Sequence, residues 1–217
     1  MITFIDTGPV DASHRLLLAH GAGAGMTSNF LDAVAALLGD HQIAVTRFEF
    51  AYMAARRDGG PKRPPPKAEK LASEFVDVIT AIRARMPANQ TLVIGGKSLG
   101  GRVASLIAGE QFQAGSISGL VCLGYPFHAP AQPLKLRTAH LEDLSCPTLI
   151  VQGDRDPFGR RDEVEALKLA PVIQLHWIGD GDHDFGPRGA SGFTRKGNLA
   201  DAAAAVATFV KARHPPS

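Results

Sequence analysis

The chain has 217 residues, of which 45% are hydrophobic and 20% are charged, and its formal net charge at pH 7 is +2. These values are typical of one globular domain, so we expect residues 1–217 to form a single domain. The near balance of charge argues against nucleic acid or a membrane surface as a general partner, and no apolar run is long enough to span a membrane. The sequence shows no secretory signal, and Cys122 and Cys146 lie in or beside apolar runs, which predicts a cytoplasmic protein with buried thiols.

Strand-like and helix-like segments alternate along the chain. Strands are expected at 15–19, 43–50, 91–94, 119–124, 148–152 and 172–178, with a further short edge strand before residue 9. Helices are expected at 30–38 with an N-cap at Ser28 or Asn29, at 71–86, after the 91–94 strand, at 163–170 and at 200–213. Strands that are apolar throughout and separated by helices predict the α/β class, with a mostly parallel sheet covered on both faces.

The segment 91–102 (TLVIGGKSLGGR) contains a G-x-S-x-G motif centred on Ser98, between an apolar run and a helix-like run. A strand, a sharp turn and a helix form the setting of a nucleophile elbow. Gly96 and Gly100 remove β-carbons that would collide with the neighbouring strand and helix. A phosphate-binding P-loop is disfavoured because Thr91 stands where that motif needs glycine. From this segment alone, a plain strand-to-helix turn remains the alternative.

A serine nucleophile needs a general base, and the base needs a carboxylate that orients it. In α/β-hydrolases these groups follow the serine in the order acid, then histidine. His183 lies late in the chain, in a glycine-flanked loop after a strand-like run, and is the expected base. Asp154 and Asp156 both follow the 148–152 strand. We favour Asp156, at the mouth of the loop, because Asp154 is closer to the strand end, where it could cap backbone N–H groups.

The negative charge that develops on a substrate oxygen needs fixed donors. We expect the backbone N–H groups of Leu99 and Ala22 to form this oxyanion hole, with Gly23 as the alternative to Ala22. A dinucleotide-binding loop at 20–25 is disfavoured because its third glycine would fall at Met26. No metal or cofactor is expected. The expected substrate-binding residues are Gly21, Gly23, Met26, Tyr52 and Phe127, and Met53 and Phe158 are further candidates for the pocket walls.

Two basic features have alternative interpretations. Lys97, beside the serine, could hold a substrate carboxylate or point to solvent. The segment 56–67, rich in proline, glycine and positive charge, could steer anionic substrates or form a solvated loop, and we favour the loop.

Five segments together resemble a known family. They are 20–26 (HGAGAGM), 47–53 (RFEFAYM), 95–102 (GGKSLGGR), 124–128 (GYPFH) and 152–159 (QGDRDPFG). They are similar to a small family of α/β-hydrolases related to the dienelactone hydrolases, which also includes the hydrolase-like region of a subunit of the eukaryotic NSL histone acetyltransferase complex. The resemblance implies an α/β-hydrolase fold and a triad of Ser98, Asp156 and His183. Dienelactone hydrolases proper use a cysteine nucleophile, so Ser98 argues against a dienelactone substrate.

The segment between Tyr125 and Cys146 is too short for a helical cap domain, which predicts an open, shallow site. The function expected is that of a serine hydrolase that cleaves a small carboxylic ester or thioester, its partner being a small-molecule acyl substrate. One alternative is a catalytically silent module that binds a partner on the same fold. Nucleotide binding at the glycine-rich loops is a third hypothesis.

Overall fold

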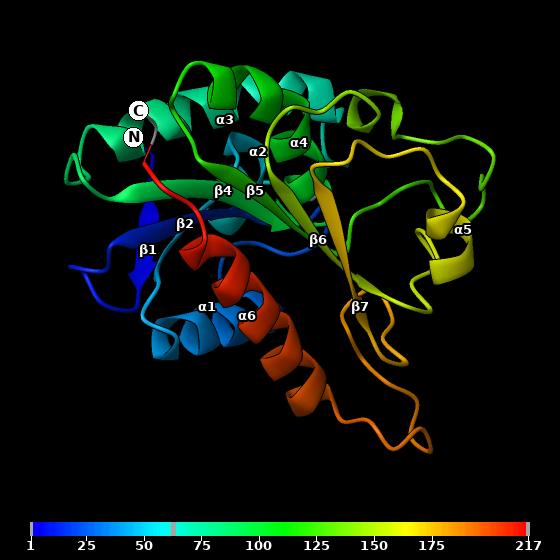
Figure 1. Cartoon of the computed structure of the whole chain (residues 1–217). Coiled ribbons are helices and arrows are strands. Elements are labelled where there is room, and N and C mark those ends of the chain that lie inside the picture. The colour runs from blue at the N-terminus through cyan, green and yellow to red at the C-terminus, as the bar shows by residue number, and fades with distance from the viewer. Residues whose placement is uncertain (1, 62–63, 216–217) are drawn as a thin grey trace.

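The computed structural model describes residues 2–61 and 64–215, and within them seven strands form one sheet in the order β1-β3-β2-β4-β5-β6-β7 (Figure 1). Strands β2 to β7 pair in parallel, whereas β1 pairs antiparallel with β3 at the edge. The predicted α/β class with a mostly parallel sheet is confirmed. The strands are β1 (Phe4–Thr7), β2 (His14–Ala19), β3 (Ala44–Phe48), β4 (Thr91–Lys97), β5 (Gly119–Leu123), β6 (Thr148–Gly153) and β7 (Ile173–Ile178).

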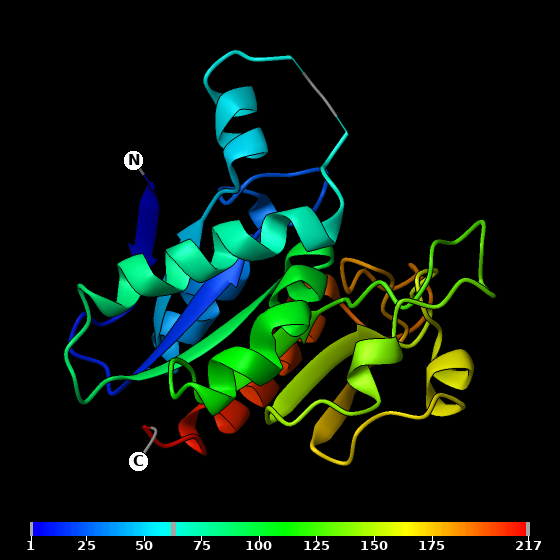
Figure 2. The same cartoon turned by 90° about the horizontal axis from the view of Figure 1, so that it is seen from above.

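Helices cover both faces of the sheet (Figures 1 and 2). Helices α1 (Asn29–Asp40) and α6 (Arg195–Lys211) pack together on one face, and α3 (Ala68–Arg83) and α4 (Leu99–Gln113) pack together on the other. Successive side chains of a strand point to opposite faces, so Leu16 joins the core under α1 and α6 while Leu17 joins the core under α3 and α4. Apolar strands are therefore needed, because both faces are buried.

Two helices differ from the prediction for reasons that lie outside their own sequence pattern. Helix α2 (Ala51–Arg57) was not expected, and its first backbone N–H group donates to Glu74 Oε2 of α3 at 2.9 Å. Helix α5 (Arg161–Glu165) starts earlier and ends earlier than the expected 163–170. The Glu163 side chain accepts from the Arg160 N–H group at its start, and beyond its end Ala170 N–H donates to Leu141 O, which draws the chain out of the helix.

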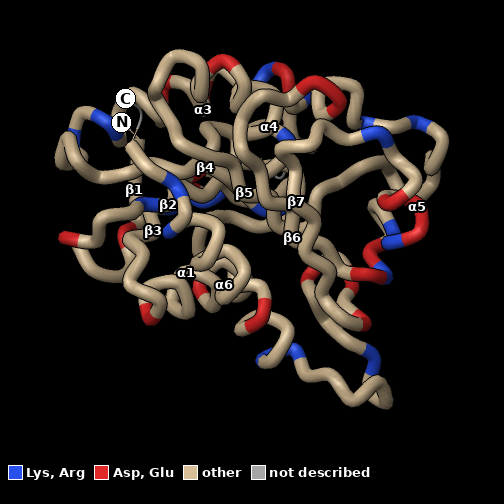
Figure 3. Tube along the Cα trace, viewed as in Figure 1, with Lys and Arg blue, Asp and Glu red and all other residues tan. Residues whose placement is uncertain are grey.

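In the part of the chain that the structure describes, no helical cap covers the edge of the sheet where the parallel strands end. The connection between β5 and β6, residues 124–147, contains only the 3₁₀ helix Ala139–Leu141. Charged residues of both signs are spread over the outer helices and loops (Figure 3). Cys122 and Cys146 are buried free thiols, as predicted. Of the helices in residues 2–61 and 64–215, none combines the length and apolar character that a membrane crossing requires.

Candidate active site

Ser98 occupies a strained turn between β4 and α4. Its backbone has φ 51° and ψ −113°, a conformation that residues with side chains rarely adopt. The turn is tight on both sides: a β-carbon on Gly96 would lie 2.5 Å from the carbonyl carbon of Gly100, and one on Gly100 would lie 2.6 Å from Ala19 O. Only glycine fits at these two positions. The G-x-S-x-G motif therefore has the geometry of a nucleophile elbow.

A chain of hydrogen bonds joins Ser98 to the loops after β6 and β7. Ser98 Oγ lies 2.9 Å from His183 Nε2, and His183 Nδ1 lies 2.8 Å from Asp156 Oδ2. Asp156 is fully buried, whereas the His183 side chain is 22% exposed. With Nδ1–H donating to the carboxylate, Nε2 is left to accept the serine hydroxyl proton. The structure thus brings together the three side chains that the sequence placed at the ends of separate strands.

Both carboxylate oxygens of Asp156 accept hydrogen bonds that hold the side chain in place. Gln152 Nε2 donates to Oδ2 at 2.9 Å, and the Phe158 backbone N–H group donates to Oδ1 at 2.9 Å. Gln152 is fully buried and was not predicted as a site residue, although an amide side chain in a mostly apolar strand was a usable signal. Asp154 instead accepts the Asp180 N–H group at 2.9 Å, the backbone role foreseen for it.

Lys97 does not point to solvent, which was one of its two expected positions. Its side chain is 8% exposed, so the expectation that it points to solvent is wrong. Its Nζ lies 3.2 Å from Asp184 Oδ1 and 5.3 Å from the centroid of the Phe30 ring. Burial lowers the pKa of Lys97, although the carboxylate of Asp184 acts in the opposite direction. Because Asp184 follows His183, this ion pair ties the strand of the serine to the loop of the histidine.

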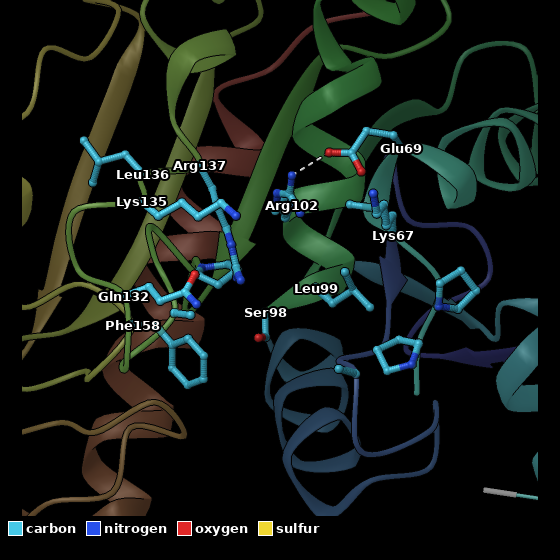
Figure 4. A pocket seen from close by; sticks show the side chains of 16 residues that line it. Lys67, Glu69, Ser98, Leu99, Arg102, Gln132, Lys135, Leu136, Arg137 and Phe158 are labelled. Carbon is cyan, nitrogen blue, oxygen red and sulfur yellow. Dashed lines mark hydrogen bonds and ion pairs between the residues drawn. The ribbon is translucent and has the colours of Figure 1, made fainter. Parts of the chain in front are cut away.

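Two clefts meet at Ser98. The larger, of about 600 Å³, runs between the start of α3 and the loop after β5, and Leu99 lies at its Ser98 end (Figure 4). Ala22 also lines this cleft. The smaller, of about 450 Å³, is lined by Gly21, Gly23, Lys97 and His183 among others. Ala22 and Phe158 line both clefts. The residues expected to bind the oxyanion and substrate at 21–23 and 99 therefore surround the serine.

The fold agrees with comparisons to known proteins. The sequence model of a family described as an alpha/beta hydrolase domain matches residues 12–211. The chain belongs to this α/β-hydrolase family. The expected α/β-hydrolase relationship is confirmed, and the expected link to the chromatin-complex subunit stays a prediction.

Solved structures share the fold of this α/β-hydrolase at low sequence identity. A dienelactone hydrolase from Anabaena variabilis is 21% identical with a TM-score of 0.73, covering 98% of this chain and 92% of that chain. A serine hydrolase without lid from Xanthomonas campestris is 18% identical with a TM-score of 0.68, covering 100% and 91%. Est1E from Butyrivibrio proteoclasticus with bound ferulic acid is 15% identical with a TM-score of 0.70, covering 96% and 93%.

Three expected substrate contacts lie elsewhere in this α/β-hydrolase. Met26 and Phe127 are buried, 2% and 0% exposed, and Tyr52 packs against the His20 ring with centroids 5.6 Å apart. None of the three lines either cleft at Ser98. Phe127 packs edge-on against Tyr125, within the core under α3 and α4. These side chains belong to the packing of the fold, and the prediction that they form walls of the site is corrected accordingly.

His20 is a further residue that the sequence analysis did not assign. It is fully buried, its Nδ1 donates to Gly21 O at 2.6 Å, and its Nε2 accepts the Phe50 N–H group at 3.2 Å. These partners require the neutral ring, and burial lowers the pKa of His20. The imidazole therefore fixes the start of the loop that carries Ala22. Among the described residues, no three His, Cys, Asp or Glu side chains are grouped as metal ligands would be.

Proposed function

We propose that this α/β-hydrolase is a serine hydrolase that cleaves a small carboxylic ester or thioester through an acyl-enzyme. The observation that carries the proposal is the continuous hydrogen-bond chain from Ser98 through His183 to Asp156. A neutral imidazole held by a buried carboxylate is the arrangement that activates a serine hydroxyl. The fold family and the similar structures named as serine hydrolases favour the same class of reaction.

In the proposed mechanism, Ser98 Oγ attacks the substrate carbonyl while His183 Nε2 takes the hydroxyl proton. Asp156 stabilises the imidazolium and keeps its ring in the correct orientation. His183 then returns the proton to the leaving group, an alcohol or a thiol, and the acyl group stays on Ser98. A water molecule, deprotonated by His183, attacks the acyl-enzyme and releases the free acid. Esters and thioesters use the same groups at each step.

We propose the backbone N–H groups of Leu99 and Ala22 as the oxyanion hole. Leu99 is the first residue of α4, so its N–H group has no partner within the helix and points out of the helix N-terminus. Ala22 lines the same cleft as Ser98 and Leu99 and lies in the loop that His20 fixes. Each such donor is worth about 10²–10³ in kcat.

The test is covalent labelling. The purified protein and its Ser98→Ala variant are treated with a fluorophosphonate, and intact mass spectrometry detects the adduct. We expect one adduct on the wild type and none on the variant, followed by hydrolysis of small acyl esters or thioesters by the wild type. A folded wild-type protein that does not react would overturn the proposal and favour the alternative of a silent partner-binding module.

A further inference from the structure

The larger cleft beside Ser98 has an uneven distribution of charge. Among the described residues, four cationic side chains line it, from Lys67, Arg102, Lys135 and Arg137, against the single carboxylate of Glu69. Figure 4 shows Lys135 and Arg137 on one wall, Lys67 and Glu69 on the other, and Arg102 between them, with Ser98 at the same opening. This concentration of positive charge contrasts with the formal net charge of only +2 for the whole chain.

The positive charge in this cleft is only partly neutralised. Glu69 Oε1 accepts from Arg102 Nη2 at 2.7 Å, but across the described residues Lys67, Lys135 and Arg137 have no carboxylate oxygen within 4.0 Å. Burial and the nearby charge of Arg102 both lower the pKa of Arg137. Cations that repel one another in a partly desolvated cleft are stabilised when an anion binds among them.

The position of His183 indicates which part of a substrate enters this cleft. The general acid must reach the oxygen or sulfur of the leaving group. His183 lines the smaller cleft and not the larger one. If the proposed function holds, the leaving group departs on the side of the smaller cleft, and the acyl group occupies the larger, cationic one.

We infer that the preferred substrates are esters or thioesters whose acyl group carries a second, anionic group, such as the monoesters of short dicarboxylic acids. This inference rests on the proposed function. Arg102 lies four residues after Ser98 on α4, about 6 Å along the helix axis, so a short acyl chain spans the serine and the cations. Guanidinium groups bind carboxylates through paired hydrogen bonds, and the Arg102 and Arg137 side chains both line this cleft. Water releases the acyl group from Ser98 as the free dicarboxylate.

The test compares two substrates that differ only in this charge: the 4-nitrophenyl monoester of glutaric acid and the same ester with its free acid methylated. The readout is the ratio of their kcat/KM values, corrected for the uncatalysed rate measured with Ser98→Ala. A variant that folds poorly loses activity on both substrates, so the ratio is insensitive to that loss. We expect the wild type to favour the anionic ester about tenfold or more, equivalent to about 1.4 kcal/mol.

Variants that remove either a positive or a negative charge from the cleft make the test specific. Arg102→Gln, Lys135→Gln and Arg137→Gln should each lower the ratio severalfold, whereas Glu69→Gln should raise it. The preference should also weaken as salt is added. The matched control is Lys168→Gln, which removes one positive charge from a side chain that is 82% exposed and lines neither cleft at Ser98.

Two negative outcomes are distinguishable. A ratio near one in a wild-type protein that reacts with fluorophosphonate and cleaves the neutral ester would overturn this inference alone. A protein that cleaves neither ester and does not react with fluorophosphonate would overturn the proposed function, and the inference with it.

Discussion

Replacement of Gln152 by methionine tests whether the support of Asp156 matters for both stability and reactivity. Gln152 Oε1 accepts the Tyr125 N–H group at 2.7 Å, and its Nε2 donates to Asp156 Oδ2 at 2.9 Å. Methionine has a similar length but replaces neither bond. A buried N–H group without a partner costs about 1–3 kcal/mol, and a hydrogen bond to a charged group contributes about 1.5–3 kcal/mol. We therefore expect the free energy of unfolding to fall by about 3–5 kcal/mol.

Urea unfolding measures this loss. With an m-value of about 2 kcal/mol/M, the midpoint should fall by about 1.5–2.5 M. The rate of fluorophosphonate labelling of the folded fraction should fall about 10- to 100-fold, because a loosened carboxylate no longer holds His183 in line with Ser98.

The chain offers a matched control for this prediction. Gln90 is also buried, accepts from Arg15 Nε at 2.8 Å, and lies at the opposite end of β4 from Ser98. Gln90→Met should lower stability in the same way but leave the labelling rate of the folded protein unchanged. Equal labelling rates for the two variants would refute the reasoning that Gln152 acts on the site through Asp156.

Two further predictions follow from buried groups near Ser98. Asp156→Asn should lower kcat by several orders of magnitude, because the amide traps the wrong imidazole tautomer of His183. Asp154→Asn should keep most of the activity. If ester hydrolysis shows the larger loss for Asp154→Asn, then Asp154 orients the base. Because burial lowers the pKa of His20 in the folded protein, its contribution to stability is complete above the unfolded-state pKa of about 6.5 and is lost as pH falls below it. The midpoint of urea unfolding is measured at about pH 7.5 and at about pH 5 for the wild type, for His20→Asn and for the control His214→Asn. The midpoint should fall less at the lower pH in His20→Asn than in the other two proteins. Equal falls in all three proteins would contradict this role of His20.

Features encoded within one segment could be predicted from the sequence. The apolar runs at 15–19 and 148–152 are strands, the glycines around Ser98 permit the tight turn, and Asp156 and His183 lie where the ends of parallel strands meet. The order of these groups along the chain was sufficient to place them together because parallel strands all end at one edge of the sheet.

Features that depend on contacts between distant segments could not be predicted in the same way. Helix α2 begins where Glu74 of α3 supplies an acceptor, and no local pattern shows that partner. Met26 and Phe127 follow strand ends, as pocket residues often do, but neighbouring layers bury them. The cationic cleft is a similar case, since its two walls come from separate parts of the chain.

The two walls of the cationic cleft are separate in the sequence, and this affects how substrate selectivity can change. Lys67 and Glu69 lie at the start of α3, whereas Lys135 and Arg137 lie in the loop between β5 and β6, and neither segment belongs to the sheet. Ser98 instead follows β4 directly, and Asp156 and His183 lie in the loops after β6 and β7. The two walls can therefore be altered one at a time, by substitution or by a change in loop length, without moving the three groups that would perform the reaction. The same scaffold could serve acyl groups of different charge by exchange of surface segments alone.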